Sequence, residues 1–389
     1  YEMSASLVGS EMCIRDRVLC ATGGAAGLYK PNNPGFSRHK MWYPPFNTGA
    51  GYAMGINAGA EMTTFEMRFI ALRCKDTIAP TGTIAQGVGA KQINSKGEVY
   101  EDKYGLTTSQ RVYGTVRENI EGRGPCYLRT EGISSEQDES LKKAYLNMAP
   151  SQTLKWIESG KNPSEQNVEI EGTEPYIVGG HTASGYWVDT NRRTTIDGLY
   201  AAGDVAGGCP QKYVTGAMAE GEIAAIDIVK ALKEEAELAD TFSSQDAAYG
   251  CHDINDDYKA LESFAEEFVS KKLEEYNAYL ERQDEVFSTE QLEEAMQKVM
   301  DTYAGGIGSH YQFNEKQLEL AKQKIEQIIT LSGNVSAADY HGLMFVYELK
   351  ERLTVCQVLI EHLKARKETR WHSFAENLDY PDKSDEWLK

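Results

Sequence analysis

The sequence predicts an α/β domain that is interrupted by an inserted α+β segment and followed by an all-α domain. Two strand–turn units indicate the α/β part. One apolar run enters a glycine-rich turn at residues 18–24, and another does so at residues 198–204, before a helix. Residues 62–175, between these units, mix strand-like runs with helical stretches. Beyond residue 232, apolar side chains recur every three or four positions, the spacing of one helix face.

The composition fits a chain of two or three domains and argues against nucleic acid as a partner. Its 389 residues carry 59 acidic and 40 basic side chains, and the formal net charge of −19 opposes binding to a polyanion. No run of 18 apolar residues is present, so we expect no direct insertion into a membrane. No secretory signal is recognisable, and the expected location is the cytoplasm.

The seven cysteines include no C-x-x-C pair. That spacing is typical of zinc sites, of cysteine-ligated iron–sulfur clusters and of redox motifs. We therefore expect reduced thiols, no metal site in this chain, and any iron–sulfur cluster on another chain.

The chain divides into five segments by pattern. Residues 1–17 match nothing that follows and resemble the translation of sequencing-adapter read-through, so we expect them to be non-native. Residues 18–61 and 176–232 are predicted to be two parts of one α/β domain. Residues 62–175 form the predicted insertion between them, and residues 233–389 the predicted helical domain.

The first strand is predicted to be buried and to end at Thr22, Gly23 and Gly24. Small residues at this place let backbone N–H groups approach the phosphates or the sugar chain of a dinucleotide. Residues 48–60 alternate small and apolar side chains, which predicts a helix packed closely on a sheet. Taken alone, a glycine-rich turn is more often only a turn.

The inserted segment is rich in basic side chains, which are able to receive an anionic ligand. Residues 94–97 predict a hairpin turn, and residues 107–160 are predicted to be helical with an exposed polar excursion at 132–143. The basic residues are Arg68, Arg73, Lys75, Lys91, Arg111, Arg117 and Arg123.

The second segment of the predicted α/β domain, residues 176–232, carries two polar candidates. Two glycines precede His181, so the backbone can pass close to a planar cofactor while the imidazole enters a cleft. A lone histidine is more often structural, but these neighbours favour one that faces a ligand. Asp204 ends the strand and is expected to accept a hydrogen bond from a cofactor hydroxyl, with a helix over residues 215–232 behind it.

The predicted helical domain shows a capping box at Ser288 and Gln291. Two apolar helix faces follow it. One comprises Leu318, Ala321, Ile325 and Ile328, and the other comprises Val346, Leu349, Leu353, Cys356, Ile360 and Leu363.

No G-x-G-x-x-G turn follows a strand in this sequence, although that motif holds the pyrophosphate of a dinucleotide. We expect the first part of the α/β domain to lie upstream of residue 18. The alternative is that the dinucleotide interpretation is wrong.

Long stretches resemble the alpha subunits of adenylylsulfate reductases, flavoproteins of the succinate dehydrogenase/fumarate reductase superfamily. They are residues 29–77 (YKPNNPGFSRHKMWYPPFNTGAGYAMGINAGAEMTTFEMRFIALRCKDT), residues 174–190 (EPYIVGGHTASGYWVDT) and residues 198–222 (GLYAAGDVAGGCPQKYVTGAMAEGE). The resemblance runs from about residue 18 to the C-terminus. It implies a partial Rossmann-like FAD-binding domain with an inserted α+β capping domain and a C-terminal helical bundle domain.

The resemblance also implies site residues. Those expected to contact FAD are Thr22, Gly23, Gly24, Thr48, Gly49, Asp204, Thr215 and Gly216, with Lys212 adding positive charge nearby. Substrate contacts carry over to Trp42, Arg73 and His181, and Arg68 is the alternative to Arg73 because it lies one short strand away.

The dicarboxylate branch of the superfamily is disfavoured. Succinate dehydrogenases and fumarate reductases carry a proton-delivering Arg in a Gly-Cys-Arg-Gly-Glu-Gly loop. Here the corresponding residues 85–90 read AQGVGA and contain no Arg. An enzyme that reduces or oxidises a dicarboxylate would therefore lack its acid.

The implied activity is the reversible two-electron reduction of adenosine 5′-phosphosulfate to sulfite and AMP, through an adduct between flavin N5 and sulfur, in dissimilatory sulfur metabolism. Arg73 would bind sulfate oxygens, His181 would donate a hydrogen bond beside it, and Trp42 would wall the flavin cleft. The implied partner in a heterodimer is an iron–sulfur beta subunit with two [4Fe–4S] clusters.

Three alternatives remain open from the sequence. One is a flavoprotein like fumarate reductase or succinate dehydrogenase, and another is an enzyme like L-aspartate oxidase, which uses oxygen directly. The third is a truncated fragment that folds but does not hold FAD.

Overall fold

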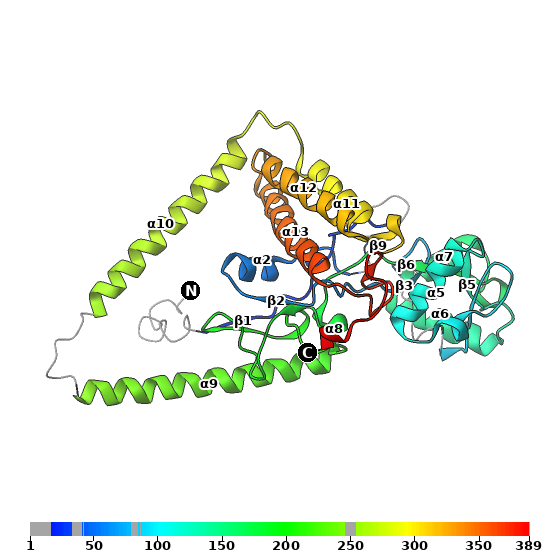
Figure 1. Ribbon diagram of the computed structural model, residues 1–389, viewed down its shortest axis with the longest axis horizontal. Coiled ribbons are helices and arrows are strands. Elements are labelled where there is room, and N and C mark those ends of the chain that lie inside the picture. The colour runs from blue at the N-terminus through cyan, green and yellow to red at the C-terminus, as the bar shows by residue number, and fades with distance from the viewer. Residues whose placement is uncertain are drawn as a thin grey trace.

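A computed structural model describes residues 17–32, 41, 43–78, 85, 87–245 and 254–388. Figure 1 shows a central α/β part, the inserted segment on one side, and helices from the C-terminal half above and beside the centre. The fold is mixed α/β with a large helical content, as the sequence predicts.

The α/β part is built around β1 (Val18–Cys20), which pairs in parallel with β8 (Leu199–Ala201), Val18 lying opposite Leu199. The two strand–turn units therefore meet side by side although about 180 residues separate them. The other elements are α2 (Ala50–Asn57), β2 (Met62–Thr63), α8 (Gly179–Thr182), β7 (Gly185–Tyr186), the 3-10 helix η3 (Gly203–Val205) and α9 (Tyr213–Gln245).

The expectation that the first strand is buried is wrong for two of its three residues. Val18 and Leu19 are exposed, and only Cys20 is buried. Within the described residues β1 pairs with β8 alone, so no described strand pairs with the outer edge of β1. A parallel sheet normally has both faces covered by helices.

The inserted segment contains a four-stranded antiparallel sheet in the order β3-β6-β5-β4. Its strands are β3 (Leu72–Cys74), β4 (Gln92–Ile93), β5 (Cys126–Leu128) and β6 (Val168–Gly172). Its helices are α4 (Glu101–Tyr104), α5 (Thr108–Ile120), α6 (Ser135–Met148), α7 (Pro150–Ser159) and the 3-10 helix η2 (Pro163–Glu165).

The helical prediction for residues 107–160 is right in part. Strand β5 interrupts it, because this run supplies a middle strand of the sheet. The polar stretch at 132–143 is not an excursion, since Ser134 and Gln137 form a capping box that starts α6. The acidic side chains of its first turn also suit the positive end of the helix dipole.

The C-terminal half is helical, and both predicted apolar faces are buried as expected. The capping box at Ser288 and Gln291 is present and starts α11. The elements are α10 (Ile254–Glu281), α11 (Thr289–Tyr303), the 3-10 helix η4 (Ile307–Ser309), β9 (Gln312–Phe313), α12 (Glu315–Ser332), α13 (Tyr340–Ala365), β10 (Glu376–Asn377) and the 3-10 helix η5 (Asp385–Leu388).

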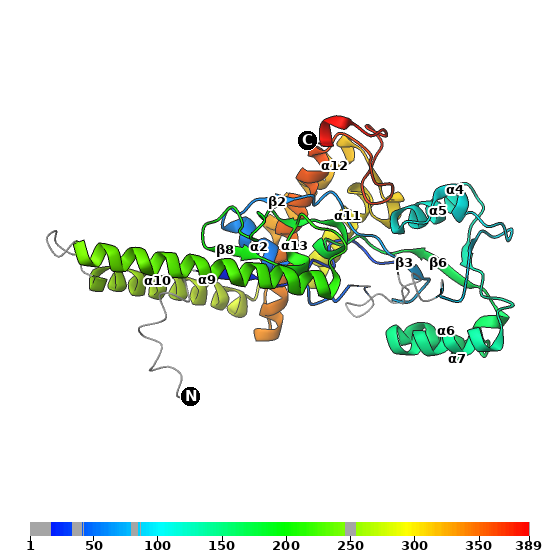
Figure 2. The same cartoon turned by 90° about the horizontal axis from the view of Figure 1, so that it is seen from below.

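Helix α9 is longer than predicted. It begins at Tyr213 and continues to Gln245, past the expected end at residue 232, because the sequence after that point contains good helix formers and neither Gly nor Pro. In Figure 1, α9 and α10 extend away from the central part, and Figure 2 shows the same extension from below.

After α13 the chain forms a strap, residues 366–388, that contacts the rest of the molecule. Strand β10 pairs in parallel with β9. The Phe374 ring lies 5.9 Å from that of Phe69, and the His372 ring stacks on Tyr113 of α5 at 4.4 Å. The strap therefore connects the helical part with residues 62–175, the inserted segment.

Candidate active site

The turn after β1 is packed so tightly that glycine is required at Gly24. A Cβ atom there would lie 2.4 Å from the carbonyl oxygen of Ile177, which already accepts a hydrogen bond from the amide of Ala25. A similar constraint holds at Gly51 in α2, where a Cβ would lie 1.9 Å from the Thr22 hydroxyl. The predicted turn, the helix behind it and the segment before His181 thus form one closely packed unit.

We expect Gly24→Ala to lower the free energy of unfolding by about 1–3 kcal/mol, the usual effect of overpacking. The backbone oxygen of Ile177 cannot move away without loss of its bond to Ala25. Thermal unfolding measures the change, with Gly87→Ala as the control because no described residue lies within 4 Å of a Cβ at that position. An unchanged melting temperature in Gly24→Ala contradicts this packing.

Asp204 is the centre of a hydrogen-bond network next to this turn. The Tyr43 hydroxyl donates to Asp204 Oδ2 at 3.0 Å and accepts from the Gly24 amide at 3.1 Å. The Tyr52 hydroxyl donates to the backbone oxygen of Asp204 at 2.9 Å. Burial, followed by the nearby Asp204 charge, raises the pKa of Tyr43 well above its usual value, so its proton stays in place. The network fixes the carboxylate relative to the glycine turn.

Lys212 lies beneath the Asp204 turn. Its Nζ atom is buried, donates to the backbone oxygens of Gly203 at 2.8 Å and Ala206 at 2.5 Å, and pairs with Glu220 at 3.1 Å. Glu220 in turn accepts from the Gly203 amide at 2.9 Å. Lys212 therefore holds the turn that carries Asp204 and does not line the cavity above it.

His181 is presented from α8 directly against this turn. The two preceding glycines make the approach possible, because a Cβ on Gly180 would lie 1.9 Å from Asp204 Oδ1. The imidazole ring packs on Phe69 at 4.3 Å and meets the edge of Tyr213 at 5.4 Å. Burial lowers the pKa of His181, and the Asp204 charge opposes that shift only in part, so the ring is neutral at pH 7.

His181 and Tyr213 form a wall between two cavities. The first cavity, of about 440 Å³, is lined by Gly23, Asp204 and the first turns of α9. The second, of about 470 Å³, is lined by Phe69, by residues 107–109 at the start of α5 and by the strap. We call them the turn cavity and the strap cavity. One imidazole thus reaches both the predicted cofactor residues and a separate space between the α/β part, the inserted segment and the strap.

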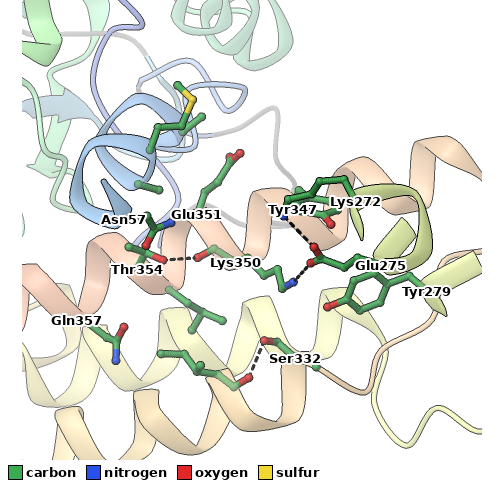
Figure 3. Close-up of a pocket in the computed structure, with 16 residues that line it drawn as sticks. Asn57, Lys272, Glu275, Tyr279, Ser332, Tyr347, Lys350, Glu351, Thr354 and Gln357 are labelled. Atoms are coloured by element: carbon green, nitrogen blue, oxygen red, sulfur yellow. Dashed lines mark hydrogen bonds and ion pairs between the residues drawn. The ribbon is translucent and has the colours of Figure 1, made fainter. Parts of the chain in front are cut away.

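The remaining predicted cofactor residues lie at two helix starts. Thr215 and Gly216 are in the first turn of α9, and Gly49 precedes α2. Thr48 is buried, and its hydroxyl donates to Glu351 of α13. Glu351 lines a third cavity, between α2 and the helical part (Figure 3).

Three charged groups of this third cavity pair with one another. Figure 3 shows Lys272 and Lys350 pointing toward Glu275, at 2.8 and 2.7 Å. The pair between Lys350 and Glu275 joins α13 to α10, whereas Lys272 and Glu275 both belong to α10. This cavity therefore lies at a contact between helices.

The two candidate arginines are buried and do not line either cavity that His181 lines. Arg73 pairs with Glu171 at 2.8 Å, contacts Asn32 and donates to the backbone oxygen of Thr77 at 2.8 Å. Arg68 donates to backbone oxygens of residues 304, 305, 311 and 374 and to the Tyr29 hydroxyl. Arg68 thus holds the helical part and the strap against the α/β part.

Trp42, the third predicted substrate contact, lies outside the described residues. Sequence reasoning missed two groups that the structure brings to the site. Tyr43 was available only as an aromatic residue, without a signal for its bond to Asp204. The strap residues of the second cavity gave no signal either, because they come from a polar, irregular stretch that folds back over almost 200 residues.

Residues 8–217 match a family model described as an FAD binding domain. The chain belongs to this family. The match begins inside residues 1–17, of which only Arg17 is described. FAD is the cofactor that membership in the FAD binding domain family indicates.

The chain is similar in sequence and in structure to adenylylsulfate reductases. Adenylylsulfate reductase subunit alpha from Megalodesulfovibrio gigas is 27% identical, over 93% of this chain and 60% of its own length. The solved structure of adenylylsulfate reductase from Archaeoglobus fulgidus is 30% identical, with a TM-score of 0.80 over 95% of this chain and 63% of that one. An adenosine-5-phosphosulfate reductase solved as a covalent adduct with sulfite is 30% identical to this chain, with a TM-score of 0.81.

This member of the FAD binding domain family is therefore a homologue of adenylylsulfate reductase alpha subunits. The chain spans less than two thirds of the length of these relatives. Among the residues that the structure describes, no helix is long and apolar enough to cross a membrane.

The turn cavity fits part of an FAD molecule. It offers a carboxylate fixed by Tyr43, the backbone of a turn where a side chain would clash, and the first turns of a long helix. Backbone amides at such turns and helix starts suit phosphate or ring oxygens, and the carboxylate suits a hydroxyl of the ribityl chain. The residues present thus fit hydroxyl and phosphate groups such as those of FAD.

Proposed function

We propose that the complete protein catalyses the reversible two-electron reduction of adenosine 5′-phosphosulfate to sulfite and AMP. The observation that carries the proposal is the position of His181, which lines both the turn cavity and the strap cavity. A redox flavoenzyme requires a substrate space in contact with its flavin space, and this residue marks the boundary. The named activity of the relatives supports the choice of substrate.

The reaction breaks the bond between sulfur and the oxygen that bridges to phosphorus. FAD, when bound, supplies the two electrons that reduce sulfur from the sulfate to the sulfite level. The bridging oxygen leaves with AMP, so negative charge grows on the phosphate as the bond breaks. Hydrogen-bond donors at that position stabilise the transition state more than the substrate.

His181 is the donor that this chain offers at the boundary. Because burial keeps its ring neutral, one ring nitrogen carries a proton to donate and no positive charge has to be desolvated. Packing on Phe69 and Tyr213 fixes the ring plane. We assign His181 to hydrogen bonding with the sulfate or the bridging oxygen.

Arg73 and Trp42 complete the proposed substrate contacts. The resemblance to adenylylsulfate reductases supports both, with Arg73 binding sulfate oxygens and Trp42 lining the flavin cleft. In the structure Arg73 contacts Asn32 and the backbone oxygen of Thr77. Its pairing with Glu171 fixes the guanidinium group, and the negative carboxylate offsets the positive charge of that group.

Electron supply is proposed to come from a separate subunit. We infer an iron–sulfur beta subunit with two [4Fe–4S] clusters, in a cytoplasmic heterodimer, from the likeness to the alpha subunits. Among the described residues, no group of three or more His, Cys, Asp or Glu is arranged to hold a metal ion.

The test is a longer chain that restores the upstream part of the FAD-binding domain. We expect it to bind FAD and to release sulfite from adenosine 5′-phosphosulfate when a reduced one-electron dye or an iron–sulfur partner is supplied. The 389-residue chain is expected to bind FAD poorly, because the pyrophosphate-binding turn is not in it.

Absorbance of protein-bound flavin and sulfite release per flavin give the two readouts. A longer chain that binds FAD yet releases no sulfite with either donor refutes the proposed activity. Fumarate reduction by the same preparation would point to the dicarboxylate alternative, and rapid oxygen consumption with aspartate to the oxidase alternative.

A further inference from the structure

The strap forms one wall of the strap cavity and places two arginines and two tryptophans on it. These are Arg366, Arg370, Trp371 and Trp387. None of them belongs to the family-derived site. They share the cavity with His181, which gives them access to whatever occupies that space.

Both guanidinium groups are held rigidly by buried carboxylates. Arg366 donates Nε to Glu66 at 2.5 Å and Nη1 to Glu368 at 2.6 Å. Arg370 donates Nε and Nη2 to Glu368 at 2.9 and 2.8 Å, and Nη2 also to the Ser384 oxygen at 2.9 Å. Glu368 has no exposed side-chain surface. The charges of the two pairs nearly cancel, so the site offers oriented donors more than net positive charge.

Each arginine keeps one terminal nitrogen for a ligand. Arg366 Nη2 and Arg370 Nη1 have no partner among the residues that the structure describes. Both side chains are partly exposed, at 17 and 16%, and both line the cavity. Donors that are already oriented lose little entropy when an oxyanion binds, and guanidinium geometry suits phosphate.

The two indoles provide an apolar surface beside these donors. Trp371 is 50% exposed and Trp387 is 39% exposed. One face of the Trp387 ring is in contact with Arg366, whose guanidinium carbon lies 5.2 Å from the ring centroid. Trp371 is the indole with more surface available. An exposed indole next to phosphate donors suits a purine, because aromatic side chains stack on any nucleobase.

We propose that the strap binds the nucleotide part of the substrate, with Trp371 stacked on the purine and the terminal nitrogens of Arg366 and Arg370 on the phosphate. The choice of an adenine nucleotide rests on the function proposed above. In this arrangement the strap recognises AMP, which is common to substrate and product, and His181 meets the sulfate end. Specificity for the nucleotide thereby comes from a different part of the chain than the redox site.

The test compares AMP with adenosine by calorimetry on the 389-residue chain, because the strap cavity is formed in it. We expect Trp371→Ala to weaken binding of both ligands about tenfold or more, the effect of losing one stacked base. We expect Arg370→Gln combined with Glu368→Gln to weaken AMP about tenfold and to leave adenosine unchanged. The double substitution avoids a buried carboxylate with too few partners.

Trp187→Ala is the matched control, because this indole is 45% exposed but does not line the strap cavity. Melting temperatures of all variants exclude unfolding as the cause. The inference is overturned if the unmodified chain binds no AMP at millimolar concentration, if Trp371→Ala binds like Trp187→Ala, or if the arginine variant loses both ligands equally. Sulfite release by the longer chain is a separate measurement. The proposed reaction can therefore be refuted while AMP binding at the strap is confirmed, and AMP binding can be refuted while the reaction is confirmed.

Discussion

Arg352→Ala is expected to lower the free energy of unfolding by about 3–5 kcal/mol, the usual effect of removing one partner of a buried ion pair. The Arg352 side chain has no exposed surface. It donates to the backbone oxygens of Ala26 at 3.0 Å and Pro45 at 2.9 Å, and it lies 3.6 and 3.7 Å from Glu293 and Glu348. Its removal therefore leaves two buried carboxylates with less compensation and removes the hydrogen bonds from α13 to Ala26 and Pro45.

Denaturant unfolding followed by circular dichroism measures this change. Arg117→Ala is the control, since Arg117 makes a partly exposed i,i+4 pair with Glu121 on α5 and such pairs contribute about 0.3–0.5 kcal/mol. A loss in Arg352→Ala no larger than that in Arg117→Ala would show that the helical part does not depend on this contact. Arg352→Met with Glu293→Gln is expected to recover part of the stability, because it removes charge from both sides.

Local patterns predicted those parts of the fold that depend on local physics. The two apolar helix faces at residues 318–328 and 346–363 follow from the helical repeat alone. The capping box at Ser288 needs only four neighbouring residues. The glycines before His181 and after β1 were recognisable because a close approach of two backbones permits no side chain.

The parts that the sequence did not reveal depend on contacts between distant segments. Strand β5 lies in a stretch with helical character and becomes a strand because β4 and β6 pair with it. Arg68 and Lys212 look like ligand cations in the sequence. In the structure Arg68 binds backbone oxygens from three distant segments, and Lys212 binds the carbonyls of one turn. Only the assembled fold shows which cationic side chains already bind other groups of the protein.

Several residues of the predicted site lie together in the structure, and their role stays a prediction. Asp204, the turn at residues 22–24 and His181 do meet around one wall, as the order of the two strand–turn units indicated. The bond from Tyr43 to Asp204 and the strap cavity were not foreseeable, since neither has a motif. Among the described residues, Arg73 lines neither the turn cavity nor the strap cavity, so its proposed cooperation with His181 rests on the family resemblance.

His181→Ala in the longer, FAD-containing chain is expected to lower turnover about a hundred- to thousandfold, or about 2.7–4 kcal/mol of transition-state stabilisation. The ring is the proposed donor at the boundary between the turn cavity and the strap cavity, and alanine would leave the sulfate end of the substrate without it. Because burial lowers the pKa of His181 below its usual 6.5, this group is already neutral above that pH. Its deprotonation should therefore produce no change in turnover between pH 7 and 8.

Turnover is measured as sulfite released per bound flavin, with melting temperature and flavin content alongside. His341→Ala, an exposed position on α13, serves as the control. A purely structural role predicts a different result: flavin or stability falls, and the folded, flavin-containing fraction turns over normally. Near-normal turnover per flavin in His181→Ala removes this residue from the site. A steep rise or fall in wild-type turnover between pH 7 and 8 that disappears in His181→Ala would show that the ring titrates there, contrary to the effect of its burial.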